Sequence, residues 1–225
     1  MSFIVAIDGP AGSGKGTITE IVSKKLGLIN IGSGEAYRCV ALQSIKEGIT
    51  IDEPQKIIKL LESINIEFKI ENGKDVIYLD GENVTDRIRQ KDVAKIVSPV
   101  SAIKEVRFKL NDIFRNVAKD KDVIMEGRDI GTYVFPNADV KIYLDASEEE
   151  RAKRRYKQNI EAGIEMSYEE ILENIRKRDE NDKKKEIGAL KQAEDAIYID
   201  SSDMSIEEVV NKVTEIINRK RKNRK

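Results

Sequence analysis

The chain has 225 residues with 40 Lys and Arg against 41 Asp and Glu, so its formal net charge is −1 and no global field selects a polyanionic partner. It has no histidine, which excludes Ser-His or Cys-His nucleophilic catalysis and His-based metal sites. Carboxylates, Lys, Arg, hydroxyls and a phosphate-bound metal remain, and these groups suit phosphoryl transfer.

The first predicted element is a short apolar strand over residues 3–7, which ends at Asp8. A Gly-rich loop, GPAGSGKGT (9–17), follows it, and a helical pattern runs from Thr17 to residue 26. Strand, Gly-rich turn and helix in this order are the layout of a phosphate-binding loop. Glycines let backbone N–H groups converge on an anion, and Lys15 adds a full positive charge. A Gly-rich surface turn is the alternative, and the agreement of strand, spacing, lysine and helix disfavours it.

The loop departs from the general signature at one position. The usual pattern has Ser or Thr directly after the lysine, where the hydroxyl ligates Mg²⁺. Here Gly16 follows Lys15, and the hydroxyl comes one residue later, at Thr17. This G-K-G-T ending resembles nucleoside-monophosphate kinases more than GTPases or motor ATPases.

The next elements are a strand at 28–31 and a helix opened by GSGEAYR (32–38). Ser33 is expected at the N-cap of that helix, where backbone N–H groups could also receive an anion. Alternating apolar runs between 64 and 84 then predict a small antiparallel sheet. We expect residues 63–98 to form an insertion in a chain that otherwise alternates strand and helix.

Residues 100–118 have apolar positions at helical spacing and are predicted to form one helix, which carries Arg107. Short buried strands follow at 123–125 and 140–144. Three later helices each begin with the capping-box pattern Ser-x-x-Glu, at Ser147, Ser167 and Ser205.

With a last strand at 196–200, five strands alternate with helices, which predicts an α/β fold with a five-stranded parallel sheet covered on both faces. Ligands bind such sheets at the C-terminal strand ends. The Gly-rich loop, the GSGEAYR segment and EGRD (126–129) all begin at such ends. Their convergence predicts a single site.

Several charged residues could serve this site. Glu126 could hold Mg²⁺ directly or through water, Arg128 could make a bidentate contact with phosphate oxygens, and Asp129 could accept from an amine. The alternative is a charged turn with a local Arg–Asp pair. On the next helix, i, i+3 and i+4 spacing places three arginines on one face, where they could close over a triphosphate or form a solvated face: Arg151, Arg154 and Arg155. Arg178 and Asp182 could pair with each other or bind ligand hydroxyls.

The chain resembles the bacterial cytidylate kinases. The resemblance rests on GPAGSGKGT (9–17), GSGEAYR (32–38), EGRDIGTYVFPNADVKIYLDAS (126–147), ERAKRR (150–155), RDENDK (178–183) and DAIYIDSSDMSIEEV (195–209). It implies a P-loop NTPase fold with a core at 1–62 and 99–225, an NMP-binding insertion at 63–98 and a helical lid at about 148–165. It also implies transfer of the ATP γ-phosphoryl group to CMP or dCMP with Mg²⁺, in pyrimidine nucleotide metabolism.

Site residues carried over from the family match this sequence motif by motif. The implied catalytic residues are Lys15, Arg128, Arg151 and Arg155. The implied ATP-binding residues are Gly9, Pro10, Ala11, Gly12, Ser13, Gly14, Lys15, Gly16, Thr17 and Arg154. The implied CMP-binding residues are Ser33, Arg38, Ser98, Arg107, Arg128, Asp129, Arg178, Asp182 and Lys185. No direct protein ligand is assigned to the metal, and Thr17 or Glu126 would reach it through water.

The sequence departs from the family at two positions. Lys185 stands where the family commonly has Arg, so the charge remains but the bidentate fork is lost. Ala189 replaces the usual proline before Leu190, which predicts a looser turn.

Other expectations concern partners and location. The single cysteine, Cys39, suits a reducing cytosol, so we expect a cytoplasmic protein. No run of 18 apolar residues is present, and we expect neither a membrane span nor a signal peptide. We also expect a monomer. We expect no nucleic-acid partner, although the basic stretch 218–225 leaves that alternative open. Another nucleotide or small-molecule kinase, or a non-catalytic nucleotide-binding switch, are the remaining alternatives. The D-x-x-G and N-K-x-D patterns of GTPase switches do not occur here.

Overall fold

The structure, a computed structural model, describes residues 2–224 and divides into two units. Ser2 and Gly27–Val123 form one, called here the 27–123 unit, and Phe3–Leu26 with the chain from Ile124 onward form the other, called the core unit. The predicted insertion at 63–98 belongs to the first and the predicted lid at 148–165 to the second. What these segments bind, and whether they move, stay predictions.

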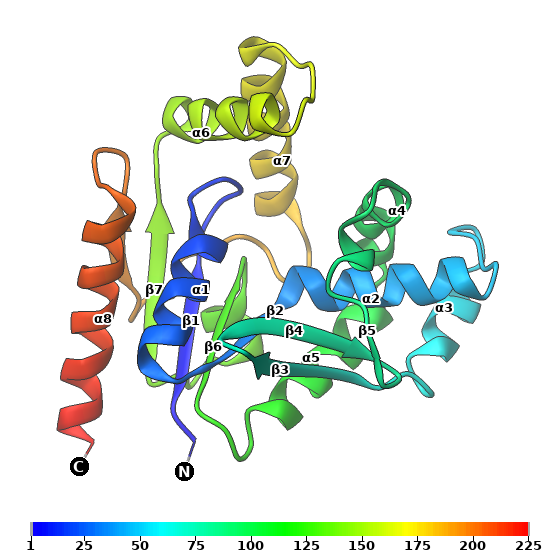
Figure 1. Cartoon of the computed structure of the whole chain (residues 1–225), viewed down its shortest axis with the longest axis horizontal. Helices are drawn as coiled ribbons and strands as arrows, with labels where there is room; N and C mark the ends of the chain where they lie inside the picture. Colours follow the sequence, from blue (N-terminus) through cyan, green and yellow to red (C-terminus); the bar gives the residue numbers. More distant parts are fainter. Residues whose placement is uncertain (1, 225) are drawn as a thin grey trace. The chain divides into compact units, whose positions relative to one another are not determined.

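The central sheet has five strands in the order β2-β6-β1-β7-β8, which confirms the predicted α/β fold (Figure 1). β1 pairs with β7 and β7 with β8, both in parallel. β1 has four buried residues in a row, because helices cover both faces of such sheets. The strands are β1 (Ile4–Asp8), β2 (Ile29–Gly32), β6 (Val123–Gly127), β7 (Val140–Asp145) and β8 (Ile197–Asp200).

In the core unit, one α-helix follows β1, two follow β7 and one follows β8 (Figure 1). They are α1 (Lys15–Leu26), α6 (Glu148–Glu161), α7 (Tyr168–Lys184) and α8 (Ile206–Asn223). α6 packs on α7 through buried Ala152, Ile171 and Ile175. α8 packs against α1 and β7. The phosphate-binding loop and α6 therefore emerge from two neighbouring strand ends, those of β1 and β7.

The capping-box predictions hold fully at two helices and half at the third. At Ser167 and Ser205 the serine hydroxyl accepts from the N3 backbone N–H and the N3 glutamate reaches back to the serine N–H. At Ser147 only the first contact forms. The Glu150 carboxylate pairs instead with Arg154, and the Ser147 N–H donates to Ser202 Oγ. Both groups of the second contact therefore have other partners.

The 27–123 unit contains the predicted antiparallel sheet, with three strands in the order β3-β4-β5. The β3–β4 hairpin turns at Asn72 and Gly73, both with positive φ. The elements of this unit besides β2 are α2 (Ser33–Lys46), α3 (Pro54–Leu60), β3 (Ile66–Glu71), β4 (Lys74–Leu79), β5 (Glu82–Asn83), the 3₁₀ turn η1 (Arg87–Arg89), α4 (Lys91–Ala102) and α5 (Lys104–Val117).

Three sequence-based boundaries are wrong. The single helix predicted over 100–118 is two helices, because Ile103 adopts an extended conformation (ψ 116°) between α4 and α5. The N-cap of α2 is Gly32 rather than Ser33, and a Cβ at Gly32 would lie 1.3 Å from Glu35 Oε2. The first helix begins at Lys15 rather than Thr17, so Lys15 lies in its first turn.

Within the described part of the chain, no helix has both the length and the apolar character needed to cross a membrane.

Candidate active site

The phosphate-binding loop between β1 and α1 takes its shape from glycines with positive φ. Gly12 and Gly14 have φ of 80° and 89°, values that residues with a side chain rarely adopt. At Gly9 the reason is space as well, since a Cβ there would lie 2.0 Å from the carbonyl oxygen of Leu144, in β7. The first position of the loop therefore admits only glycine, because its backbone packs against the end of β7.

Lys15 folds back into this loop. Its ammonium donates to the Pro10 carbonyl oxygen at 2.7 Å and lies 3.3 Å from Ser13 Oγ, and the residue is only 4% exposed. Burial, reinforced by the charge of Arg128, lowers the pKa of Lys15 to about 7, while Glu126 and Asp8 partly oppose the shift. The loop thus holds a cation that titrates near neutral pH.

This pKa predicts proton uptake when a nucleotide binds. Phosphate oxygens beside Lys15 favour its charged form and raise the pKa, so binding at about pH 8 should take up close to one proton at this lysine. In the free protein the folded-state pKa is below the unfolded value of 10.5, so the unfolded chain binds more protons between about pH 7 and 10.5. The contribution of Lys15 to stability therefore rises with pH in that window.

Isothermal titration of MgADP into the protein at about pH 8, in two buffers of different ionisation enthalpy, measures this uptake. Lys15→Arg is the control, because a guanidinium does not titrate in this range and should remove the uptake. Equal proton counts for the two proteins would contradict the assignment.

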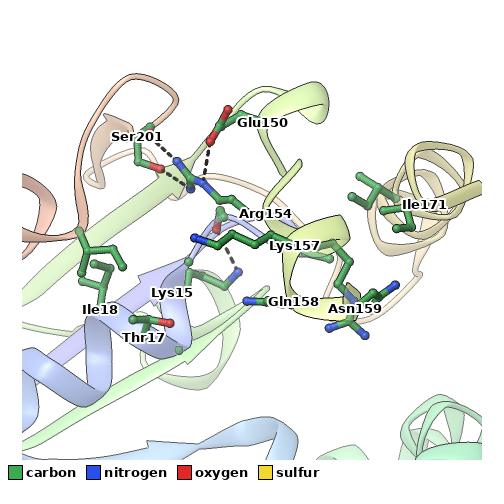
Figure 2. Close-up of a pocket in the computed structure, with 18 of the residues that line it drawn as sticks. Lys15, Thr17, Ile18, Glu150, Arg154, Lys157, Gln158, Asn159, Ile171 and Ser201 are labelled. Carbon is green, nitrogen blue, oxygen red and sulfur yellow. Dashed lines mark hydrogen bonds and ion pairs between the residues drawn. The ribbon is translucent and has the colours of Figure 1, made fainter. Parts of the chain in front are cut away.

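A cavity of about 960 Å³ opens beside the loop (Figure 2). Residues 11–18 line it without a gap, from the loop into the first turn of α1. Five further residues predicted for the site also line it: Glu126, Arg128, Arg154, Arg155 and Arg178. The structure thus places the donor-loop residues around one space with Glu126 of β6, Arg128 directly after it, and arginines of α6 and α7.

Sequence reasoning missed several lining residues. Lys157 and Gln158 extend from α6 toward the loop (Figure 2). Their spacing of three and four residues from Arg154 places them near its face, and this periodicity could have found them. Ser201, after β8, also lines the cavity, and no local signal marks it.

Arg154 is fixed by contacts with two elements. Its guanidinium donates to the Ser201 carbonyl oxygen at 2.7 Å and lies 3.3 Å from Ser201 Oγ (Figure 2). Its Nε lies 3.2 Å from Glu150 Oε1, one turn earlier on α6. These contacts hold the start of α6 against the segment that follows β8.

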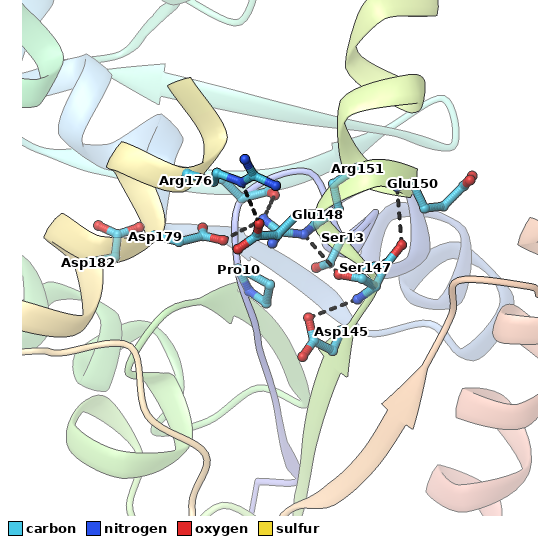
Figure 3. Close-up of polar contacts among 12 residues, drawn as sticks. Pro10, Ser13, Asp145, Ser147, Glu148, Glu150, Arg151, Arg176, Asp179 and Asp182 are labelled. Carbon is cyan, nitrogen blue, oxygen red and sulfur yellow. Dashed lines mark hydrogen bonds and ion pairs between the residues drawn. The ribbon is translucent and has the colours of Figure 1, made fainter. Parts of the chain in front are cut away.

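Arg151 is a buried contact between three segments rather than a lining residue of the cavity. Its guanidinium donates to the carbonyl oxygens of Ala11 and Ala146, both at 2.9 Å, and pairs with Asp179 of α7 at 2.7 Å (Figure 3). The Arg151 and Asp179 side chains are 4% and 6% exposed. The predicted face of three arginines is therefore divided, with Arg151 buried, Arg154 half-buried and Arg155 exposed.

Asp182 joins two of the predicted acceptor residues. Its carboxylate accepts from Arg128 Nε at 2.9 Å and from Lys185 Nζ at 2.7 Å. Burial raises the pKa of Asp182, but these two cations outweigh it and hold the pKa below the usual range. Asp182 thus pairs with Arg128 and Lys185, whereas the helical spacing indicated Arg178.

Four other predicted CMP-binding residues belong to the 27–123 unit. Ser33 begins α2, and Arg38 of the same helix donates to the Ile88 carbonyl oxygen at 3.2 Å. Ser98 is exposed on α4, and Arg107 is half-buried on α5. Their role toward the cavity of the core unit remains a prediction.

The comparisons with known proteins identify the family. The cytidylate kinase family model matches residues 5–219. The chain belongs to the cytidylate kinase family. A cytidylate kinase of Caldicellulosiruptor saccharolyticus is 50% identical over 212 residues, which are 94% of this chain and 94% of that protein. One of Clostridioides difficile is 43% identical over 217 residues, which are 96% and 99% of the two chains.

Solved structures support the fold of this cytidylate kinase family member. The crystal structure of an uncharacterized protein from Eubacterium ventriosum aligns with a TM-score of 0.54 at 12% identity. It covers 97% of this chain and 99% of that one. At this identity the likeness extends to the fold alone.

Proposed function

We propose that the protein transfers the γ-phosphoryl group of ATP to CMP or dCMP, giving CDP or dCDP, as a step of pyrimidine nucleotide metabolism. The observation that carries this proposal is the cation-lined cavity beside the phosphate-binding loop in a chain of the cytidylate kinase family. Phosphoryl transfer depends on positioning and on neutralising phosphate charge, and this cavity supplies groups for both.

The donor side is built from the loop and α6. Backbone N–H groups of the loop and the N-terminus of α1 would bind the ATP phosphates, and Lys15 would neutralise charge on the phosphoryl group in transit. Arg155 lines the same cavity and is exposed, so its guanidinium can reach a bound triphosphate. Arg151 instead holds the Ala11 carbonyl oxygen, and we assign it to positioning the loop.

The acceptor side is built around Arg128 and Asp129, directly after β6. Arg128 lines the cavity and would hold the CMP phosphate, with its side chain oriented by Asp182. Asp129 would accept from the cytosine amine, while Ser98 and Arg107 would contact the rest of the base. Ser33 and Arg38 would add to the phosphate contacts, and Arg178, Asp182 and Lys185 to those of the pentose and phosphate.

The residues present fit Mg²⁺ bound mainly through nucleotide phosphates. Mg²⁺ keeps several waters and takes few protein carboxylates, and the described residues contain no group of three Asp, Glu or Cys that could hold a metal by themselves. Thr17 and Glu126 line the cavity and offer a hydroxyl and a carboxylate to it. When bound, the cation would neutralise charge on the phosphates.

An ADP-release assay over a panel of nucleoside monophosphates with MgATP tests the function. We expect CMP and dCMP to exceed UMP and AMP in kcat/KM by roughly a hundredfold, because uracil would turn a carbonyl toward the Asp129 carboxylate and leave it unpaired. Equal turnover of AMP or UMP would refute the cytosine assignment and leave the kinase fold intact.

Contacts of the basic tail support a function without a nucleic-acid partner. The guanidinium groups of Arg221 and Arg224 lie over the Phe3 ring, at 5.0 and 5.7 Å from its centroid. Arg224 also pairs with Asp139 at 3.1 Å. Part of the tail charge thus stabilises the core unit, and Lys225, the last residue of the tail, lies outside the described residues.

We propose that the protein acts as a monomer.

A further inference from the structure

Asp8, the last residue of β1, is a buried carboxylate outside the set of residues assigned above. It is 4% exposed, and its two oxygens accept from two backbone N–H groups. Oδ1 accepts from Ile130 at 2.7 Å, and Oδ2 from Gly131 at 2.7 Å. These donors open the π-helical turn η2 (Ile130–Val134), and the first N–H groups of a helical turn lack acceptors within it.

The turn held by Asp8 carries the proposed acceptor residues. Arg128 and Asp129 immediately precede Ile130, so anchoring the Ile130 and Gly131 N–H groups limits the backbone positions open to both. The Asp129 carbonyl oxygen in turn accepts from the N–H groups of Tyr133 and Val134. Gly131 has little spare room, since a Cβ there would lie 3.2 Å from Lys141 Cδ and 3.3 Å from Asp8 Oδ2.

Asp8 is equally fixed on the donor side. It is covalently followed by Gly9, whose backbone packs against Leu144 too closely to admit a side chain. The carboxylate therefore moves with the phosphate-binding loop. It also lies close enough to Lys15 for each charge to shift the pKa of the other.

We propose that Asp8 is a positioning residue that holds the Arg128–Asp129 turn in register with the phosphate-binding loop, and so sets the placement of the acceptor phosphate relative to the phosphoryl donor. The proposal rests on the CMP kinase function proposed above. Burial raises the pKa of Asp8 to about 6, so both oxygens are acceptors at about pH 7.5.

Asp8→Asn tests this with nearly the same side-chain volume. An amide has one oxygen acceptor, and its NH₂ group would face a backbone N–H, so one anchor becomes a contact between two donors. We expect the KM for CMP to rise by roughly tenfold with a fall in kcat, while the Kd for MgADP changes by less than about threefold. A smaller fraction of folded protein would lower apparent kcat and leave both constants unchanged.

Amide hydrogen exchange provides a readout that needs no substrate. The segment 128–135 should exchange faster in Asp8→Asn, and this holds even if CMP proves not to be the acceptor. Failure of the proposed function would instead appear as wild-type protein that does not phosphorylate CMP. The two failures are therefore distinguishable.

Two further variants make the test specific. Asp145→Asn is the matched control, because Asp145 also ends a strand of the sheet and accepts a backbone N–H, that of Ala146, at 2.8 Å. It should leave the KM for CMP within about twofold. Gly131→Ala disturbs the same contact from the turn side and should reproduce the Asp8→Asn kinetics in weaker form. It provides the test if Asp8→Asn folds poorly. Unchanged exchange over 128–135 together with Asp145→Asn-like kinetics would overturn the proposal.

Discussion

Lys15→Met should lower kcat for CMP phosphorylation by roughly a thousandfold while the protein stays folded. Removing one preorganised donor from a transition-state site costs about 10²–10³ in kcat, and Lys15 adds a full charge to that loss. Stability should not fall in proportion, because the wild-type fold already carries the cost of burying this ammonium, as its lowered pKa indicates.

Single-turnover kinetics with MgATP and CMP, alongside thermal unfolding, measure the two effects separately. Lys24→Met is the matched control on the same helix, because Lys24 pairs with Glu20 at the surface, where such pairs contribute at most about 1 kcal/mol. The control should retain wild-type kcat. Activity of Lys15→Met within tenfold of wild type would remove Lys15 from the proposed mechanism.

The donor loop was predictable from sequence because its signals are local. The apolar run before Asp8, the glycines and Lys15 occupy adjacent positions, and their backbone needs are met within the loop and the neighbouring strand. The boundary of α1 differed by two residues, because Lys15 can enter the helix while its side chain folds back onto the loop.

The contacts of the acceptor and lid residues were less predictable because they depend on packing between distant segments. Spacing indicated that Arg178 would pair with Asp182, but Asp182 pairs with Arg128, which lies 54 positions earlier. Spacing also grouped Arg151 with its neighbours on α6, while its partners come from the loop and from α7. The helix break at Ile103 has no Gly or Pro at that position, so periodicity alone extended the helix across it.

Arg151→Met should destabilise the protein by about 3–5 kcal/mol, because it leaves the Asp179 carboxylate buried without its cation. Asp179 Oδ1 already has no hydrogen-bond partner within the described structure, so no second group compensates for the loss. Urea unfolding measures this change. Lys177→Met on α7 is the control: it breaks the exposed pair with Glu173 and should cost less than about 0.5 kcal/mol.

The double variant Arg151→Met/Asp179→Leu separates the charge from the packing. Replacing both members of a buried pair with apolar side chains of similar volume is often neutral, so most of the lost stability should return. A remaining deficit of about 1–2 kcal/mol is expected, because the Ala11 and Ala146 carbonyl oxygens still lack their donor. The KM for ATP should be raised both in Arg151→Met and in the double variant, since in each the Ala11 segment of the loop has lost its anchor. A double variant that regains stability and also a wild-type KM for ATP would show that Arg151 supports the fold alone and not the donor site.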